Sequence, residues 1–387
     1  MAHEQIFTSE SVTPGHPDKL CDQISDAVID AFLRQDPRAR AMVECAVATG
    51  VLFVSARFAA DATVDIPGLA REVVGNAGYL DAGFDARSCS ILTSFTELPA
   101  AERLPASARR AESEPALEQA NAFGFACSET PALMPLPIWL AHRLARALYE
   151  ARPELEALGA DGKTQVAVTY RGGRPHRIHS IALSAALREP GAEKRLVQLV
   201  HDRVIPRAFD GEGVAPDART ETHVNSGAFY MVGGPARHSG LTGRKTGIDT
   251  YGEYARQSGA ALSGKDPSRI DRIGAYAARH AARNVVAAGL ATRCEVHLAY
   301  AIGSAQPLSV AVNTFGTGVE DDDAITRRLE HAIDFRPGMI EQRFELRARA
   351  AASAHGFFRP LAVYGQVGRT DLDLPWEQDD LVPVLRR

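Results

Sequence analysis

One order of secondary structure recurs three times along the 387 residues of the chain. In the first copy, Leu20, Ile24, Val28 and Phe32 recur at helical spacing, and two strand-like runs and a second helical stretch follow. Each copy is predicted to contain a helix, two strands and a second helix, in that order. In the first copy these elements cover residues 17–34, 41–47, 51–58 and 67–79, and in the second copy they cover residues 135–151, 164–170, 176–184 and 193–209. In the third copy they cover residues 267–288, 294–301, 308–315 and 322–333. The repeat is far too long for a solenoid, so it predicts three similar units, each a sheet with helices on one side. The expected fold class is α+β, with three helix and antiparallel-sheet domains related by pseudo-threefold symmetry.

The three predicted domains cover residues 3–101, 115–232 and 233–372. Between the first two, residues 98–115 are rich in Ala, Glu, Arg and Pro and show little periodicity, which indicates a loop. A loop of this length favours a mobile lid over an ordinary connector. Residues 210–222 indicate a second exposed connector.

The composition is typical of a soluble globular protein, with 45% apolar and 24% charged residues. The net charge of −5 argues against a general nucleic-acid binder, and no apolar run is long enough to cross a membrane. Five scattered cysteines without a CxxC pair predict neither a disulfide framework nor a cysteine-rich zinc site. Residues 1–12 are too polar for a signal peptide, so we expect a reducing, cytoplasmic location.

Two glycine-flanked turns in the third unit concentrate positive charge. They read GLTGRK at residues 240–245 and GKDPSRID at residues 264–271. Gly243 and Gly264 allow tight backbone conformations and close approach of a ligand. The four cations of these turns are Arg244, Lys245, Lys265 and Arg269.

The second turn leads directly into the predicted long helix of the third unit. We expect Asp266 as its N-cap and Pro267 at its first position. A helix N-terminus with cations beside it favours a polyanion such as phosphate, and Asp271 is placed to hold a divalent ion that the polyanion brings. The alternative is a basic surface turn followed by an ordinary capped helix.

The stretch GHPDK at residues 15–19 opens the first predicted helix. Pro17 suits the first helical position, and Asp18 suits the helix dipole. His16 lies just outside the helix, where a ligand would bind. Alone, this stretch also fits a capped helix with a histidine facing solvent.

Together these motifs resemble the S-adenosylmethionine synthetase (methionine adenosyltransferase) family. The resemblance rests on residues 7–12, 15–19, 233–235, 240–245, 263–271, 275–279, 299–303 and 314–317, and covers nearly the whole chain. It implies three similar α+β domains and active sites between the subunits of a homodimer or a dimer of dimers. It also implies attack of methionine sulfur on C5′ of ATP, release of triphosphate, and hydrolysis of the triphosphate to pyrophosphate and phosphate.

The resemblance also implies a role for individual residues. The expected triphosphate contacts are His16, Lys163, Arg244, Lys245 and Lys265. Asp18 and Asp271 look like the Mg²⁺ ligands, and Glu44 looks like the carboxylate of a K⁺ site. The expected nucleotide contacts are Asp161, Tyr230, Arg269 and Ile302.

The acceptor-binding part departs from the family pattern. Where the family has two carboxylates beside the methionine ammonium, this chain has Arg57 and His238. Residues 114–120 replace the family's glycine-rich loop: Glu118 stands where the family has an Asp, and Gln119 matches the family's Gln. At the position of a Gln that helps to bind methionine in the family, this chain has Leu98. Exchange of carboxylates for a cation disfavours an ammonium group.

We therefore expect an ATP-using adenosyltransferase whose small sulfur-containing acceptor is methionine or a thioether or thiol without an ammonium group. Compensating residues elsewhere would restore methionine as the acceptor. Two rival functions are a non-catalytic ATP-binding paralogue and an ATP triphosphohydrolase without an acceptor. The retained phosphate and metal residues argue against a non-catalytic scaffold.

Overall fold

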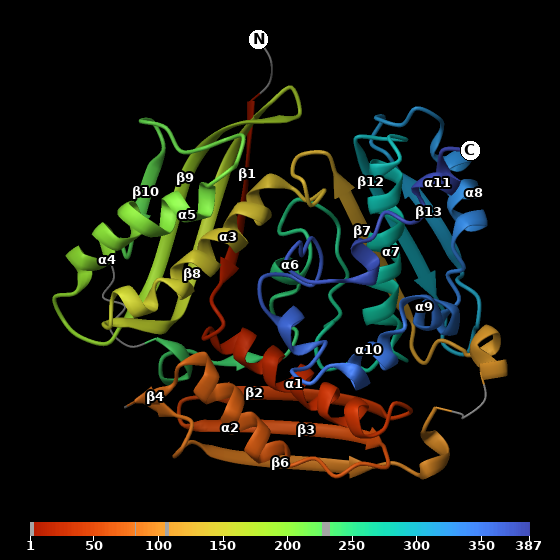
Figure 1. Ribbon diagram of the computed structural model, residues 1–387, viewed down its shortest axis with the longest axis horizontal. Coiled ribbons are helices and arrows are strands. Elements are labelled where there is room, and N and C mark those ends of the chain that lie inside the picture. Colours follow the sequence, from red (N-terminus) through yellow and green to blue (C-terminus); the bar gives the residue numbers. More distant parts are fainter. Residues whose placement is uncertain (1–3, 82, 105–107, 227–232) are drawn as a thin grey trace.

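The computed structural model describes residues 4–81, 83–104, 108–226 and 233–387. It shows three larger sheets arranged around a centre that contains the short helix α6 (Thr246–Asp249) (Figure 1), and a small two-stranded sheet of β4 (Leu80–Asp81) and β5 (Phe84–Asp85). Each larger sheet carries helices on one face, so the α+β class with three similar units is confirmed. None of the helices in these described ranges is long and apolar enough to cross a bilayer.

The sheets are built on three antiparallel hairpins that match the predicted strand pairs. The first sheet has the order β11 (Gly240–Leu241), β2 (Arg40–Ala48), β3 (Val51–Ala59) and β6 (Ser90–Glu97). The second has the order β1 (Glu4–Val12), β8 (Leu158–Arg171), β9 (Arg174–Leu187) and β10 (Glu221–Val224). The third has the order β13 (Ser309–Asn313), β12 (Arg293–Tyr300) and β7 (Ala120–Cys127). The pairs β3–β6 and β9–β10 are parallel, so two of the three sheets are mixed.

The first strand of each unit belongs to the sheet of the next unit. Strand β1 runs antiparallel to β8 of the second unit, and β7 runs antiparallel to β12 of the third. Strand β11 closes the cycle because it pairs with β2 of the first unit. The domain limits 3–101, 115–232 and 233–372 remain a proposal, and the sheets cross them at these three strands.

Long helices cover one face of each sheet. They are α1 (Pro17–Gln35) with α2 (Ile66–Ala77), α3 (Leu136–Glu150) with α4 (Glu193–Leu199) and α5 (Ile205–Phe209), and α7 (Ile270–Ala287) with α8 (Asp322–Ala332). The predicted helix 193–209 contains a π-helical segment at Val200–Val204. Pro206 follows this segment, and its missing N–H removes one of the i→i−4 bonds of a regular α-helix.

The helix that we expected from residue 267 begins instead at Ile270. Asp266 is fully buried and does not cap it, because its carboxylate accepts the backbone N–H groups of Ala41 and Ser268 and pairs with Arg347. This side chain therefore fastens the turn to the first unit, and Pro267 lies in the turn.

The predicted loop 98–115 has short helical turns at Ala100–Glu102 and Ala108–Ser113. Its described flanks are tied down by the ion pairs Arg103–Asp36 and Arg40–Glu114. The hypothesis of a lid over residues 98–115 stays a prediction, and residues 105–107 of this loop lie outside the described residues.

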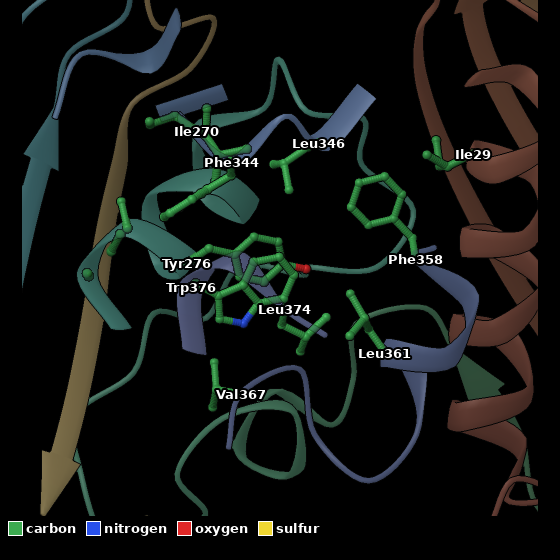
Figure 2. Close-up of a cluster of buried hydrophobic side chains, with 14 of the residues drawn as sticks. Ile29, Ile270, Tyr276, Phe344, Leu346, Phe358, Leu361, Val367, Leu374 and Trp376 are labelled. Carbon is green, nitrogen blue, oxygen red and sulfur yellow. The ribbon is translucent and has the colours of Figure 1, made fainter. Parts of the chain in front are cut away.

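The C-terminal segment forms part of the core. After α9 (Pro337–Phe344) and α10 (Leu346–Ala352), Trp376 stacks on Tyr276 with ring centroids 3.8 Å apart and planes 6° from parallel (Figure 2). Trp376 is fully buried, and its Nε1–H donates to the carbonyl of Gln366 at 3.0 Å. The last helix, α11 (Val382–Leu385), follows. The C-terminal segment from Asp371, which is rich in acidic residues, thus packs against α7 of the third unit.

Candidate active site

The two basic turns lie side by side along one edge of strand β2. The backbone N–H of Thr242 donates to the carbonyl of Cys45 at 2.9 Å, and the N–H of Val43 donates to the carbonyl of Gly264 at 2.8 Å. Gly243 and Gly264 have φ of 72° and 79°, the left-handed region that favours glycine. A Cβ on Gly264 would lie 2.1 Å from the carbonyl oxygen of Val43, so this close approach also needs glycine.

A row of carboxylates on helix α1 holds the same turns from the other side. Asp18 Oδ1 accepts the N–H of Leu241 at 3.0 Å, Asp22 Oδ1 accepts that of Gly243 at 2.7 Å, and Asp26 Oδ1 accepts that of Gly264 at 2.8 Å. Asp30, one turn further, accepts N–H groups of residues 357–359. Residues four apart share one helix face, so a single helix positions three segments of the third unit, namely the two basic turns and residues 357–359.

This carboxylate row is almost completely buried, and cations balance part of its charge. Lys19 donates to Asp22 at 2.9 Å and also to Asp249, and these three side chains are fully buried. Arg272 makes two bonds of 2.7 Å to Asp26. The spacing of four residues places these aspartates on one face of α1, and the structure shows that this face is buried.

A first group of predicted residues gathers at the N-terminal end of α1. Lys163 of β8 pairs with Glu10 of β1, and Lys245 lies 3.3 Å from the same carboxylate. Burial acts to raise the pKa of Glu10, but the two lysines outweigh it and lower that pKa below its usual value. Arg244 reaches to 3.9 Å from Asp18. Glu10 was not predicted, although it lies inside the opening motif of the chain.

Burial dominates the environment of Asp18. Burial raises its pKa, even though the Leu241 N–H and Arg244 act in the opposite direction. Its second oxygen, Oδ2, has His16 Nδ1 3.8 Å away. A buried carboxylate with an oxygen free to bind is a suitable ligand for a hard divalent cation.

A second group of predicted residues gathers at the start of α7. Lys265 pairs with Asp271, and Arg269 lies 3.7 Å from Glu118. Burial and the nearby charge of Asp271 raise the pKa of Glu118. The turns of the two groups attach to Asp18 and Asp26, which are two helical turns, or about 12 Å, apart along α1.

His16, Asp161 and His238 form a third cluster. His238 Nε2 lies 2.8 Å from Asp161 Oδ2, and the backbone N–H of Gly234 donates to the same oxygen at 2.7 Å. The rings of His16 and His238 have their centroids 5.0 Å apart. Burial lowers the pKa of His16 to about 3, so its imidazole is neutral at physiological pH.

Other predicted residues do not join these groups within one chain. Glu44 and Arg57 are exposed on the outer face of the first sheet, opposite to the face that α1 covers. Ile302 is 66% exposed, and Gln119 is exposed at the start of β7. Tyr230 lies outside the described residues. The same outer sheet face exposes the large apolar side chains of Val51, Phe53 and Leu92.

Three family models match the chain in order. They describe the N-terminal domain of S-adenosylmethionine synthetase over residues 4–99, its central domain over 113–229 and its C-terminal domain over 232–378. The chain is 43% identical over 402 residues to an S-adenosylmethionine synthase of Synechococcus sp. (strain JA-3-3Ab), covering 98% of this chain and 97% of the relative. S-adenosylmethionine synthases of Trichormus variabilis and Trichodesmium erythraeum are 42% and 43% identical over 409 residues, covering 100% of this chain and 97% of each relative.

Proposed function

The chain belongs to the S-adenosylmethionine synthetase family, and from this premise we propose that it transfers the adenosyl group of ATP to the sulfur atom of a small acceptor. It is an ATP-dependent adenosyltransferase of the methionine adenosyltransferase type. Sulfur attacks C5′ of ATP, the C5′–O bond breaks, and the whole triphosphate leaves. The triphosphate is then hydrolysed to pyrophosphate and phosphate.

The observation that carries this proposal is the double attachment of the basic turns. A thioether sulfur needs no general base, so the main barrier is the charge that develops on the leaving triphosphate. Lys245 and Lys265 lie on turns that are fixed by both the edge of β2 and the carboxylates of α1. Such fixed cations need little reorganisation during the reaction, which is the source of electrostatic catalysis.

Asp18 and Asp271 fit a role as Mg²⁺ ligands, and Glu44 fits a K⁺ site on the sheet surface. Both aspartates offer carboxylate oxygens, which Mg²⁺ prefers, and Asp18 keeps its Oδ2 near the end of α1 while its Oδ1 accepts the Leu241 N–H. When bound, Mg²⁺ would neutralise the triphosphate and orient it. The residues of the chain supply the remaining positive charge.

We propose that the complete site forms between two chains of a homodimer. One chain presents the residues around Asp18 and those around Lys265 in separate groups, and Arg57 and Glu44 lie on an exposed sheet face. That face also carries exposed apolar side chains, which mark a surface that binds a protein partner. A second copy placed on it would bring these residues to a shared site.

We propose that the acceptor lacks the free ammonium group of methionine, with methionine itself as the alternative. His238 lies in the cluster with His16 and Asp161, where the family resemblance places a carboxylate beside the ammonium. Arg57 carries a permanent positive charge, which repels an ammonium group and attracts an anion. The 42–43% identity to relatives named S-adenosylmethionine synthase supports the alternative of methionine, and product analysis distinguishes the two acceptors.

The deciding experiment is mass spectrometry of products after incubation with ATP, Mg²⁺, K⁺ and a panel of thioethers and thiols with and without amino groups. An adenosylated sulfur product confirms the transfer and identifies the acceptor class. Free adenosine with phosphates would indicate a triphosphohydrolase, and unchanged ATP across the panel would indicate a non-catalytic paralogue. Either result would overturn the proposal.

A further inference from the structure

We propose that a cavity between helix α3, helix α5 and the C-terminal segment binds a small phosphate-type dianion. The cavity has a volume of about 200 Å³ and lies between these two helices and residues 364–371. This is many times the roughly 10–15 Å³ that a single buried water needs. Its described lining residues include none of those predicted for the triphosphate, the metal ions, the nucleotide or the acceptor. The inference therefore goes beyond adenosyl transfer and does not depend on it.

The walls of the cavity carry more positive than negative charge. Four arginines and two acidic residues line it, namely Arg143, Arg146, Arg207 and Arg369 with Glu150 and Asp371. Four positive and two negative charges leave a net charge of +2, which favours an anion with two charges. A guanidinium group presents its N–H groups in a planar fork that matches the oxygens of phosphate.

Arg207 and Arg146 have donors to spare for such a ligand. Arg207 lies 3.5 Å from a carboxylate oxygen of Glu154, which is longer than an ordinary hydrogen bond. Arg146 donates to Asp371 at 2.8 Å through one of its terminal nitrogens. Arg369 is fully occupied, because it donates to both oxygens of Asp371 and to three backbone carbonyls. We therefore place the anion beside Arg207 and Arg146.

Two buried polar groups on the wall of the cavity add to this. His142 and Tyr364 line the cavity and are only 8% and 9% exposed. In the described part of the chain, neither His142 Nε2 nor the Tyr364 hydroxyl has a hydrogen-bond partner. Ser11 Oγ lies 2.8 Å from His142 Nδ1, and when this hydroxyl donates to Nδ1 the ring proton lies on Nε2. A buried donor without a partner is unfavourable, so an anion whose oxygens accept from both groups would stabilise this wall.

The cavity is separate from the candidate active site, although strand β1 contacts both. The side chain of Ser11 bonds to His142, and the preceding residue, Glu10, pairs with Lys163. Neighbouring residues of a strand point to opposite faces, so the cavity and the lysine group lie on opposite sides of β1. An anion beside Arg207 is therefore a second ligand and not triphosphate in the candidate active site.

The test is a fluorescence titration with inorganic phosphate and, separately, with pyrophosphate, at constant ionic strength and without ATP or metal ions. Of the two tryptophans, Trp139 lines the cavity, whereas Trp376 is fully buried in the core. We expect a saturable change in Trp139 fluorescence that persists in Lys265→Ala, which lacks a cation of the candidate active site. The anion that binds more tightly identifies the ligand as one phosphate group or two.

Two variants then test the walls of the cavity. Arg207→Gln should weaken binding about tenfold or more, because it removes a charged donor. Tyr364→Phe should weaken binding by a smaller factor, and without the anion it should not lower the melting temperature, because the lost hydroxyl has no partner in the described chain. The matched control is Arg203→Gln, which removes an arginine one helical turn earlier that is 67% exposed and lies outside the cavity lining.

Three outcomes would overturn the inference. Equal affinity in the wild type, Arg207→Gln and Arg203→Gln would show unspecific attraction to surface arginines. A signal that is lost in Lys265→Ala would show that Trp139 reports binding in the candidate active site. Failure of both anions to bind saturably, by fluorescence and by calorimetry, would exclude the ligand class. None of these results bears on adenosyl transfer, which product analysis tests separately.

Discussion

The carboxylate of Asp22 on helix α1 accepts the backbone N–H of Gly243 at 2.7 Å, so a helix of the first unit fixes a basic turn of the third. The other oxygen of Asp22 accepts from buried Lys19 at 2.9 Å. One side chain thus links the positions of the cations to the stability of the core.

Replacement of Asp22 should separate these two tasks. Asp22→Ala leaves the Gly243 N–H without its acceptor and removes one of the two carboxylates beside Lys19, and breaking a buried pair of this kind costs about 3–5 kcal/mol. Asp22→Asn keeps one acceptor and should cost clearly less. Urea unfolding of both variants measures the free energies. Equal costs for Ala and Asn would show that the hydrogen bond to the turn contributes nothing.

Loss of a leaving-group contact should slow the chemical step. Lys265→Ala and Asp18→Asn each remove a charged group from the proposed triphosphate and Mg²⁺ site, and one such electrostatic contact contributes about 10²–10³ in kcat. Triphosphate and phosphate release from ATP provides the assay. Arg171→Ala, which removes an exposed cation paired with Glu4, is the matched control and should keep its activity. Near-normal turnover in both site variants would exclude the leaving-group argument.

A site shared between two chains predicts complementation. Asp18→Asn and Lys265→Ala homodimers should each be nearly inactive, but mixed dimers regain one intact site if the two residues come from different chains. Random reassortment of equal amounts then restores about a quarter of the wild-type activity. No recovery in verified mixed dimers would place both residues in one chain's site. An active monomer in light scattering at assay concentration would contradict the shared site altogether.

Restoration of the family's carboxylates should favour methionine. Arg57→Glu with His238→Asp replaces two groups that disfavour an ammonium by two that bind it, and we expect kcat/KM for methionine to rise by about tenfold or more. Steady-state kinetics of the double and single variants measure the gain. If the wild type already uses methionine at an ordinary rate with KM below about 1 mM, the acceptor proposal is wrong and the protein is a plain S-adenosylmethionine synthetase.

Acid should destabilise the protein through His142. Burial lowers the pKa of His142 to about 3, with further lowering by Arg369, Lys19 and Arg146, while its Nδ1 bonds to Ser11 at 2.8 Å. Between pH 3 and 6.5 the unfolded chain therefore binds this proton and the folded chain does not, so stability falls as pH falls through 6.5.

The comparison of wild type with His142→Gln isolates this effect from other titrating groups. At pH 7.5 the variant loses only packing and the bond to Ser11. At pH 5 its disadvantage should shrink by about 2 kcal/mol, because it has no imidazole to protonate. Urea unfolding at both pH values measures the difference. A stability difference that does not change with pH would mean that His142 titrates normally in the folded protein.

Sequence periodicity predicted those parts of the fold that depend on local patterns. The face of α1 formed by Leu20, Ile24, Val28 and Phe32 is buried as expected, and the three hairpins lie where alternation placed them. The carboxylates on another face of α1 were not predicted to be buried, because a solvated and a buried carboxylate look alike in a sequence. Their hydrogen-bond partners are backbone N–H groups more than 200 residues away in the chain. Every residue except proline has such a group, so the identity of a residue does not show which N–H group will be the partner.

The sequence motifs predicted which residues belong to the site, but they did not predict which of these residues contact one another. Lys163 and Lys245 were expected near phosphate, but their common partner Glu10 was missed because it lies on a strand that local patterns assign to the first unit. Asp266 was expected as a helix cap, yet tertiary bonds to Ala41 and Arg347 decide its position.

Strands β1, β7 and β11 each belong to the sheet of another unit, and this affects when each sheet can form during synthesis of the chain. During synthesis, the first sheet lacks its edge strand until residues 240–241 have left the ribosome, although its central hairpin ends at Ala59. The strand at the N-terminus likewise waits for residues 158–171. The first and third sheets therefore stay incomplete until parts of the third unit have been translated, and a nascent chain that stalls before residue 240 exposes unpaired strand edges of the kind that aggregate.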